Sequence, residues 1–146
     1  MSAVTGIATT PPVTVIRPAL RLAPFADELA DWLHEGIAAH LTGTVRRTPV
    51  RPAVLIVPEY LHTAPEALLA DLATGRWAGR AVGLVGYAGR TRARYALEDA
   101  RETLQDAGAL VVGPAVGIDV ARVRARGFDA ADVLLRDLVL DELAAA

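Results

Sequence analysis

The chain has 146 residues, of which 53% are hydrophobic, and its formal net charge at pH 7 is −2. This composition predicts one compact globular domain, and it gives no electrostatic reason to expect nucleic acid or a membrane surface as a partner. All fifteen strongly basic residues are Arg, Ser2 is the only serine and cysteine is absent, which excludes a Schiff-base lysine, an internal serine nucleophile, a thiol nucleophile and disulfide bonds.

The start of the chain shows no targeting signal. Residues 1–12 lack the basic start and the apolar core of a signal peptide. No apolar run approaches the ~20 residues that a membrane span needs. We therefore expect a flexible segment over residues 1–12, a single domain over residues 13–146 and a cytoplasmic location.

The first half of the domain predicts two strand-to-helix units. Residues 13–16 indicate a short strand, and a loop over 17–23 leads into a helix over 24–40. That helix is predicted from apolar residues at helical spacing, which are Phe25, Leu29, Trp32, Leu33 and Ile37. The connection over 41–52 has room for one brief strand near Val45.

The stretch that follows is the most informative of the chain. Residues 54–57 form an unbroken apolar run, as expected of a parallel strand that is covered on both faces. Pro58 ends this strand, and a helix is predicted from Ala64 to about Thr74. Thr63 and Glu66 have the spacing of a capping box, and Pro65 is then expected in the first helical turn.

The second half of the domain continues the alternation. We expect a strand over residues 79–86, a loop over 87–90 and a helix over 91–107 that Gly108 ends. Residues 110–112 and 116–118 supply a final strand region. Asp129 is placed to cap the last helix, whose apolar residues Val133, Leu134, Leu138 and Leu143 are expected to face inward. Further apolar residues on that helix, at 135, 139 and 140, widen the stripe enough to suggest that it also packs on a partner.

This alternation of strands and helices predicts a doubly wound parallel sheet with helices on both faces. Three loops, over residues 17–23, 58–63 and 87–91, then emerge at the carboxyl edge of the sheet. Open sheets of this kind bind their ligands at that edge. A carboxylate, an aromatic ring and an imidazole are concentrated in the middle loop, as Glu59, Tyr60 and His62.

Two of these loops carry a family resemblance. Pro58-Glu59-Tyr60, followed by His62, Thr63 and Pro65, resembles the Pro-Glu-Tyr-Asn-(Gly/His)-Ser-x-Pro signature of the NADPH-dependent FMN reductases. Val85-Gly-Tyr87-Ala-Gly89 is similar to the flavin loop of the same family. The resemblance covers about residues 53–140. It implies a small flavodoxin-like fold, here with a second strand that is short or missing.

The resemblance also implies a cofactor, a co-substrate and an assembly. The cofactor would be FMN, reduced by NADPH or NADH, and the acceptor would be a flavin, a quinone or another small aromatic molecule. Because this family builds its flavin site at a subunit interface, a homodimer or a heteromer with a related chain is expected. The residues that would line the ring are Pro58, Glu59, Tyr60, Leu61, His62 and Thr63 on one side and Tyr87, Ala88, Gly89 and Arg90 on the other.

The sequence departs from the family pattern at the phosphate-binding loop. The family uses a Gly-Ser-x-Arg-x-x-Ser segment, whose hydroxyl and backbone N–H groups hold the FMN phosphate. This chain has Arg17-Pro-Ala-Leu-Arg21-Leu-Ala there, so Arg17 and Arg21 are left to hold a phosphate. The departure keeps two alternatives open, which are a flavin-free binding or assembly subunit and an enzyme that uses Tyr60, His62 and Glu59 without a flavin.

Each candidate side chain also has an interpretation without chemistry. Tyr60 stacks on a ligand ring or fills the sheet edge, and His62 donates a proton or is simply a loop residue. Glu59 is interpreted as structural. Arg92 and Arg94, like Arg90, either bind a phosphate of the nucleotide or flavin or form a solvated helix start. We expect no metal site, because the histidines lack further ligands at metal spacing.

Overall fold

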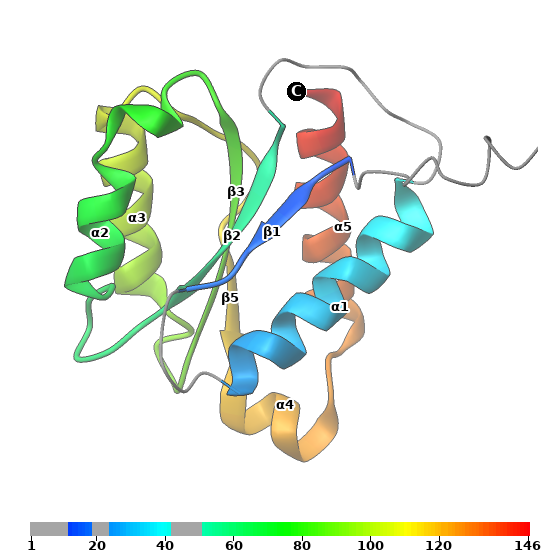
Figure 1. Ribbon diagram of the computed structural model, residues 1–146. Coiled ribbons are helices and arrows are strands. Elements are labelled where there is room, and N and C mark those ends of the chain that lie inside the picture. The colour runs from blue at the N-terminus through cyan, green and yellow to red at the C-terminus, as the bar shows by residue number, and fades with distance from the viewer. Residues whose placement is uncertain (1–11, 19–23, 42–50) are drawn as a thin grey trace, which may run out of the picture.

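The computed structural model describes residues 12–18, 24–41 and 51–146, and the segments at 1–11, 19–23 and 42–50 lie outside this description. The described residues form a sheet between two layers of helices (Figure 1). The strands are β1 (Thr14–Ile16), β2 (Ala53–Pro58), β3 (Ala81–Ala88), β4 (Leu110–Val111) and β5 (Val116–Asp119). The helices are α1 (Pro24–His40), α2 (Glu66–Leu72), the short 3₁₀ helix η2 (Gly75–Trp77), α3 (Arg94–Asp106), α4 (Val120–Arg126) and α5 (Ala130–Ala145).

All strand pairs are parallel, and β3 is the centre of the sheet. The order is β1-β2-β3-β4, and β5 also pairs with β3 beyond the short β4. Helices α1 and α5 cover one face, and α2 and α3 cover the other (Figure 1). The predicted doubly wound α/β arrangement is therefore confirmed. The strand proposed near Val45 lies outside the described residues.

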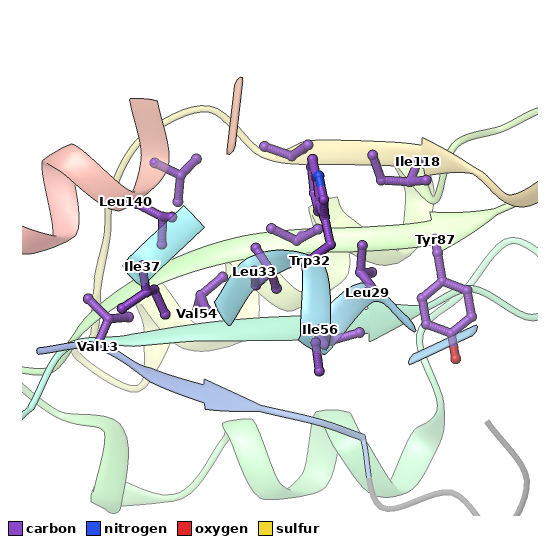
Figure 2. Packing of buried hydrophobic residues seen from close by; sticks show 14 of the residues in the cluster. Val13, Leu29, Trp32, Leu33, Ile37, Val54, Ile56, Tyr87, Ile118 and Leu140 are labelled. Carbon is purple, nitrogen blue, oxygen red and sulfur yellow. The ribbon is translucent and has the colours of Figure 1, made fainter. Parts of the chain in front are cut away.

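The apolar residues of β2 contribute to the hydrophobic clusters on both faces of the sheet. Val54 and Ile56 belong to the cluster under α1 and α5, where Leu29 and Leu33 pack on them (Figure 2). Leu55 and Val57 belong to the cluster under α2 and α3. Because successive side chains of a strand point to opposite faces, a strand covered on both sides needs an unbroken apolar sequence.

Helix α1 has the predicted bounds, and its predicted apolar positions are buried. Its Trp32 ring stacks on Phe128 at a centroid distance of 4.1 Å. The buried guanidinium of Arg136, from α5, donates to the carbonyl oxygen of Trp32 at 3.1 Å and lies over its ring. These contacts fix α1 against α5 and against the residue Phe128 that precedes α5.

The start of α2 differs from the prediction. Pro65 is the N-cap residue rather than part of the first turn, and it makes no capping hydrogen bond through its side chain. The Thr63 hydroxyl instead donates to Asp99 of α3 at 3.0 Å. The capping box proposed for Thr63 and Glu66 is therefore wrong, because a long-range partner takes the hydroxyl.

Strand β3 and helix α3 also differ at their ends. Tyr87 and Ala88, expected in the outgoing loop, pair with Ile118 and Asp119 of β5. The helix predicted from residue 91 begins at Arg94, since the two preceding residues adopt left-handed φ angles of 51° and 60°.

The last helix has the predicted cap but a different inward face. Asp129 and Asp132 form a capping box at the start of α5. Val139, Leu140 and Leu143 are buried, whereas Leu134 and Leu138 are 61% and 44% exposed. The prediction that Leu134 and Leu138 face inward is wrong, because the apolar stripe is wide enough for either rotation. No helix in the described part of the chain is both long and apolar enough to cross a bilayer.

Candidate functional site

The loops that follow β2 and β3 lie together at the carboxyl edge of the sheet. Pro58, the last residue of β2, is in register with Tyr87 of β3. The backbone N–H of Glu59 donates to the carbonyl oxygen of Tyr87 at 3.2 Å, which extends this pairing into the loop. Arg17 follows β1 on the same edge, because all three strands run parallel. The predicted convergence of the three loops is therefore present for their described residues.

The turn at residues 60–63 is tight and carries two left-handed residues. Tyr60 and Thr63 exchange backbone hydrogen bonds of 2.9 and 3.1 Å around Leu61 and His62, whose φ angles are 51° and 62°. This is the geometry of a type I′ turn, which favours Asn or Gly. Leu61 stands where the FMN reductases have Asn, and its side chain is 98% exposed. The backbone N–H groups of Leu61 and His62 donate to no other described residue, so they are available to a ligand.

The carboxylate of Glu59 is fully engaged within the protein. One oxygen accepts a hydrogen bond from the backbone N–H of Ala96 at 3.0 Å, and the other accepts one from the Thr91 hydroxyl. Ala96 lies in the first turn of α3, where unpaired N–H groups carry the positive end of the helix dipole. Glu59 therefore joins the two candidate loops and caps α3, as its structural interpretation requires.

Two tyrosines and a phenylalanine form an aromatic group beside these loops. Tyr60 is 51% exposed, whereas Tyr87 is only 8% exposed and packs on Phe25 of α1 at a ring distance of 5.4 Å. Burial raises the pKa of Tyr87 to about 12, and the neighbouring Tyr60 and Asp27 add to the shift. The Tyr60 side chain lies near enough to affect the Tyr87 phenol, but among the described residues no group makes a hydrogen bond of good geometry with the Tyr87 hydroxyl. A buried hydroxyl left without a partner is uncommon, because its desolvation is not compensated.

His62 is held beside the start of α3 rather than free in the loop. Its ring lies 4.9 Å from the Tyr95 ring, with a tilted geometry. The Tyr95 hydroxyl accepts a hydrogen bond from Arg94 at 2.7 Å. His62 is exposed, so its imidazole remains open to solvent.

The loop after β3 supplies the opposite edge of the candidate site. Ala88 is half-buried, and Gly89 and Arg90 are exposed. A Cβ atom built on Gly89 would meet no atom within 4 Å, so a ligand can approach the backbone there. Arg90 makes no ion pair with another described residue.

The described part of the first loop does not provide a phosphate cradle. The Arg17 guanidinium pairs with Asp27, in the first turn of α1, at 2.6 Å. The helix also begins at Pro24, which has no N–H to donate. Arg21 lies outside the described residues. A phosphate at this helix start would have to compete with the Asp27 carboxylate for Arg17.

The described residues would fit the two parts of a flavin unequally. The N–H groups of residues 61 and 62, which have no described acceptor, and the open backbone at Gly89 suit a flat ring with polar edges, whereas the Tyr87 hydroxyl is buried. The described residues near α1 suit its phosphate poorly. Within the described ranges, no group of three or more acidic or histidine side chains is placed to hold a metal ion.

Two residues of this edge have structural roles that are not predicted from the sequence. Thr91 was expected to be only the start of a helix, yet its hydroxyl holds Glu59. Asp27 has no role in the sequence prediction, although an acidic residue in the first turn of a helix next to a phosphate loop is itself a signal.

The fold and this edge define a flavodoxin-like α/β protein. One similar solved structure is the flavoenzyme NAD(P)H:(acceptor) oxidoreductase FerB from Paracoccus denitrificans, with a TM-score of 0.59, 16% identity and coverage of 91% of this chain and 94% of that one. Another is the flavodoxin of Streptococcus pneumonia TIGR4, with a TM-score of 0.56, 17% identity and coverage of 91% and 96%. No protein-family model matches the chain, and no curated protein matches it. At such low identities the likeness shows the fold.

Proposed function

We propose that this protein is a flavin-dependent NAD(P)H oxidoreductase of the FMN reductase type, acting on a flavin, a quinone or another small aromatic acceptor. The observation that carries the proposal is the pair formed by half-exposed Tyr60 and buried Tyr87, whose hydroxyl has no partner among the described residues. The pair lies where flavodoxin-like sheets bind ligands. The similarity of the fold to that of FerB, which is described as a flavoenzyme, supports the same proposed function.

The residues would act mainly by position. Tyr60 would pack against the ring, and the buried Tyr87 hydroxyl would hydrogen-bond a polar atom at its edge once the ring displaces the side chains that cover it. The free N–H groups of Leu61 and His62 would hold a second polar edge. A bound flavin would itself supply the transfer of electrons from NADPH or NADH to the acceptor. His62, which is exposed beside Tyr95, would be the nearest candidate to donate a proton to that acceptor.

The Arg17–Asp27 ion pair affects how tightly this protein would bind the phosphate of FMN. If Arg17 stays with Asp27, the phosphate of FMN adds little to affinity, and FMN and riboflavin bind almost equally. Replacing Asp27 with Asn frees Arg17 and removes a negative charge. We then expect FMN, but not riboflavin, to bind about 3- to 10-fold more tightly. This range corresponds to about 1 kcal/mol, the energy expected when a partly exposed arginine interacts with a phosphate.

The test is flavin binding by fluorescence quenching and by the visible spectrum of the purified protein. Saturable quenching at one site per chain, weakened in Tyr60→Ala by about 1–3 kcal/mol of lost stacking, supports the proposal. Asp31→Asn is the matched control for Asp27→Asn, because Asp31 is an exposed acid on the next turn of α1. Absence of quenching at high concentrations of both flavins would refute the flavin-dependent function.

The second candidate is a flavin-free subunit that binds or assembles with a related chain. The Arg17–Asp27 pair favours it, because it occupies the expected phosphate position with a carboxylate. An enzyme that uses Glu59 as an acid or base without flavin is less well supported, since both Glu59 oxygens are engaged by Thr91 and Ala96. If the purified protein is colourless and forms a complex in size-exclusion chromatography only when a related chain is added, the flavin-free subunit is the better hypothesis.

A second subunit also belongs to this proposal. Leu61 places a large apolar side chain at the tip of the turn, 98% exposed and next to Tyr60. A homodimer or a heteromer would cover it and close the ring side of the site from water. Sedimentation should then show self-association that Leu61→Asp weakens, while Ala70→Asp, on the exposed side of α2, leaves it unchanged.

A further inference from the structure

A cavity lies at the opposite edge of the sheet from β1. Its volume is about 450 Å³, and its walls come from the start of α3, the strand β5 and helix α5. Leu97, Ala115 and Leu135 give it apolar surface, and these three residues pack against the two cores. The volume is within the range of small-molecule sites in proteins.

The lining of this cavity is strongly basic. Arg92, Arg94 and Arg101 line it, against the single carboxylate of Glu98. Arg94 is engaged by Tyr95, through a hydrogen bond and by lying over its ring. The side chains of Arg92 and Arg101 have neither an ion pair nor a hydrogen bond with another described residue.

Arg92 and Arg101 are among the seven of twelve described arginines that make no ion pair with another described residue. Five of the arginines pair with carboxylates of Asp or Glu, namely Arg17, Arg76, Arg122, Arg124 and Arg136. Two cations left without a partner on the wall of one cavity raise the affinity of that cavity for anions. The guanidinium group is also the side chain best shaped to bind a carboxylate or a phosphate with two hydrogen bonds.

The backbone around Arg92 is fixed against the floor of the cavity. Its carbonyl oxygen lies so close to Gly117 of β5 that a Cβ atom there would be only 2.1 Å away. Arg92 itself adopts a left-handed φ of 51°, followed by Ala93 at 60°. The missing side chain at Gly117 therefore lets the loop lie on the strand and sets the position from which the Arg92 side chain starts.

The geometry points to a binding site for a small organic anion, with a carboxylate or phosphate group held by Arg92 and Arg101 and an apolar body on Leu97 and Leu135. This goes beyond the proposed flavin function. The cavity does not include Tyr60 or Tyr87, and its existence does not depend on flavin binding. The ligand is a carboxylate on a flat apolar body or a phosphate monoester of similar size.

The test is NMR titration of the ¹⁵N-labelled, flavin-free protein with adenosine 5′-monophosphate, benzoate and inorganic phosphate. We expect saturable shifts of the Ala115 and Gly117 amides with one or both organic anions, and weaker binding of inorganic phosphate, which cannot use the apolar floor. Saturation by adenosine monophosphate alone identifies a phosphate ligand, and saturation by benzoate alone identifies a carboxylate.

The variants separate this site from general attraction to a basic surface. Arg92→Gln combined with Arg101→Gln should weaken binding at least about tenfold, as expected for the loss of charged hydrogen bonds. Arg126→Gln, at the exposed end of α4, also removes an arginine that has no described ion pair, but it lies outside the cavity and should change nothing. The single variant Arg101→Gln, on the surface of α3, keeps the test valid if the double variant does not fold.

The proposal is overturned if neither organic anion gives a saturable shift at Ala115 and Gly117, or if Arg126→Gln weakens binding as much as the double variant. The outcome is independent of flavin binding, because the flavin titration reports quenching at Tyr60 and Tyr87. A protein that binds no flavin but saturates with an organic anion would contradict the proposed oxidoreductase and leave this site intact.

Discussion

The carboxylate of Glu59, just after β2, accepts a hydrogen bond from the backbone N–H of Ala96 in the first turn of α3. An N-terminal helix cap is usually supplied by the residue that precedes the helix, but Ala93 precedes α3 and no local side chain caps it. The cap is instead supplied from 37 residues away in the chain. The loop that carries Tyr60 and the helix that carries Tyr95 are therefore fixed to each other.

Replacing Glu59 with Gln should destabilise the protein. The variant keeps the shape but loses the charge that interacts with the helix start, so we expect the free energy of unfolding to fall by about 1–2 kcal/mol. Urea unfolding measures the change. Glu102→Gln, on an exposed position of the same helix, should have little effect, and equal losses in the two variants would contradict the capping role.

Replacing Tyr87 with Phe should have opposite effects on stability and on flavin binding. The change removes a buried hydroxyl without a described partner, so the free energy of unfolding should stay constant or rise by up to about 1 kcal/mol. Flavin binding should weaken if that hydroxyl holds the ring. Loss of stability on removing the hydroxyl would show that it has a partner in the free protein.

The same residue predicts a dependence on alkaline pH. Burial raises the pKa of Tyr87 to about 12, above the ~10 of an unfolded tyrosine, so the neutral phenol stabilises the folded state below about pH 10. This contribution is lost as the pH rises through the folded value. Urea unfolding between about pH 10 and 12 should therefore show a steeper loss of stability in the natural protein than in Tyr87→Phe.

The cap of α5 predicts a dependence on acid. The backbone N–H of Asp132 donates to the Asp129 carboxylate at 2.8 Å and lowers its pKa, and Arg122 adds to the shift. The charged carboxylate thus stabilises the folded state above about pH 4, and this stabilisation is lost as the pH falls through the lowered value. Asp129→Asn keeps a capping oxygen but cannot titrate, so its stability should fall less in acid. Asp141→Asn, exposed on the same helix, should follow the natural protein.

Gly83 should tolerate no side chain. A Cβ atom there would lie 2.4 Å from a methyl group of Val139 and 3.0 Å from one of Leu143, where α5 packs on β3. Gly83→Ala should lower the free energy of unfolding by about 1–3 kcal/mol through overpacking. Gly75→Ala is the control, because a Cβ atom there has no neighbour within 4 Å. Similar unfolding midpoints for the two variants would contradict close packing at this contact.

The sequence predicts elements best where one local pattern determines them. The apolar spacing of α1 and the unbroken run of β2 each leave little choice of structure, and both elements were correctly predicted. Prediction failed where a distant residue decides. The start of α3 depends on how Arg92 lies against Gly117, and Thr63 turns to Asp99 rather than to its own helix.

The same distinction applies to the candidate site. The rule that parallel strands share a carboxyl edge was enough to bring residues 58–63 and 87–90 together. The ion pair between Arg17 and Asp27 was not predicted, although it affects the phosphate position, because many acidic residues of this chain were equally plausible partners. The wide apolar stripe of α5 likewise left its rotation undetermined.

The central place of β3 has a consequence for how this protein opens. It hydrogen-bonds to β2, β4 and β5 and contributes to both hydrophobic clusters, so neither helical layer can separate without exposing it. Amides at residues 82–87 should therefore exchange with solvent deuterons only through global unfolding, while those of the short β1 exchange through smaller fluctuations. One strand thereby makes the loss of either face of the sheet a single cooperative event.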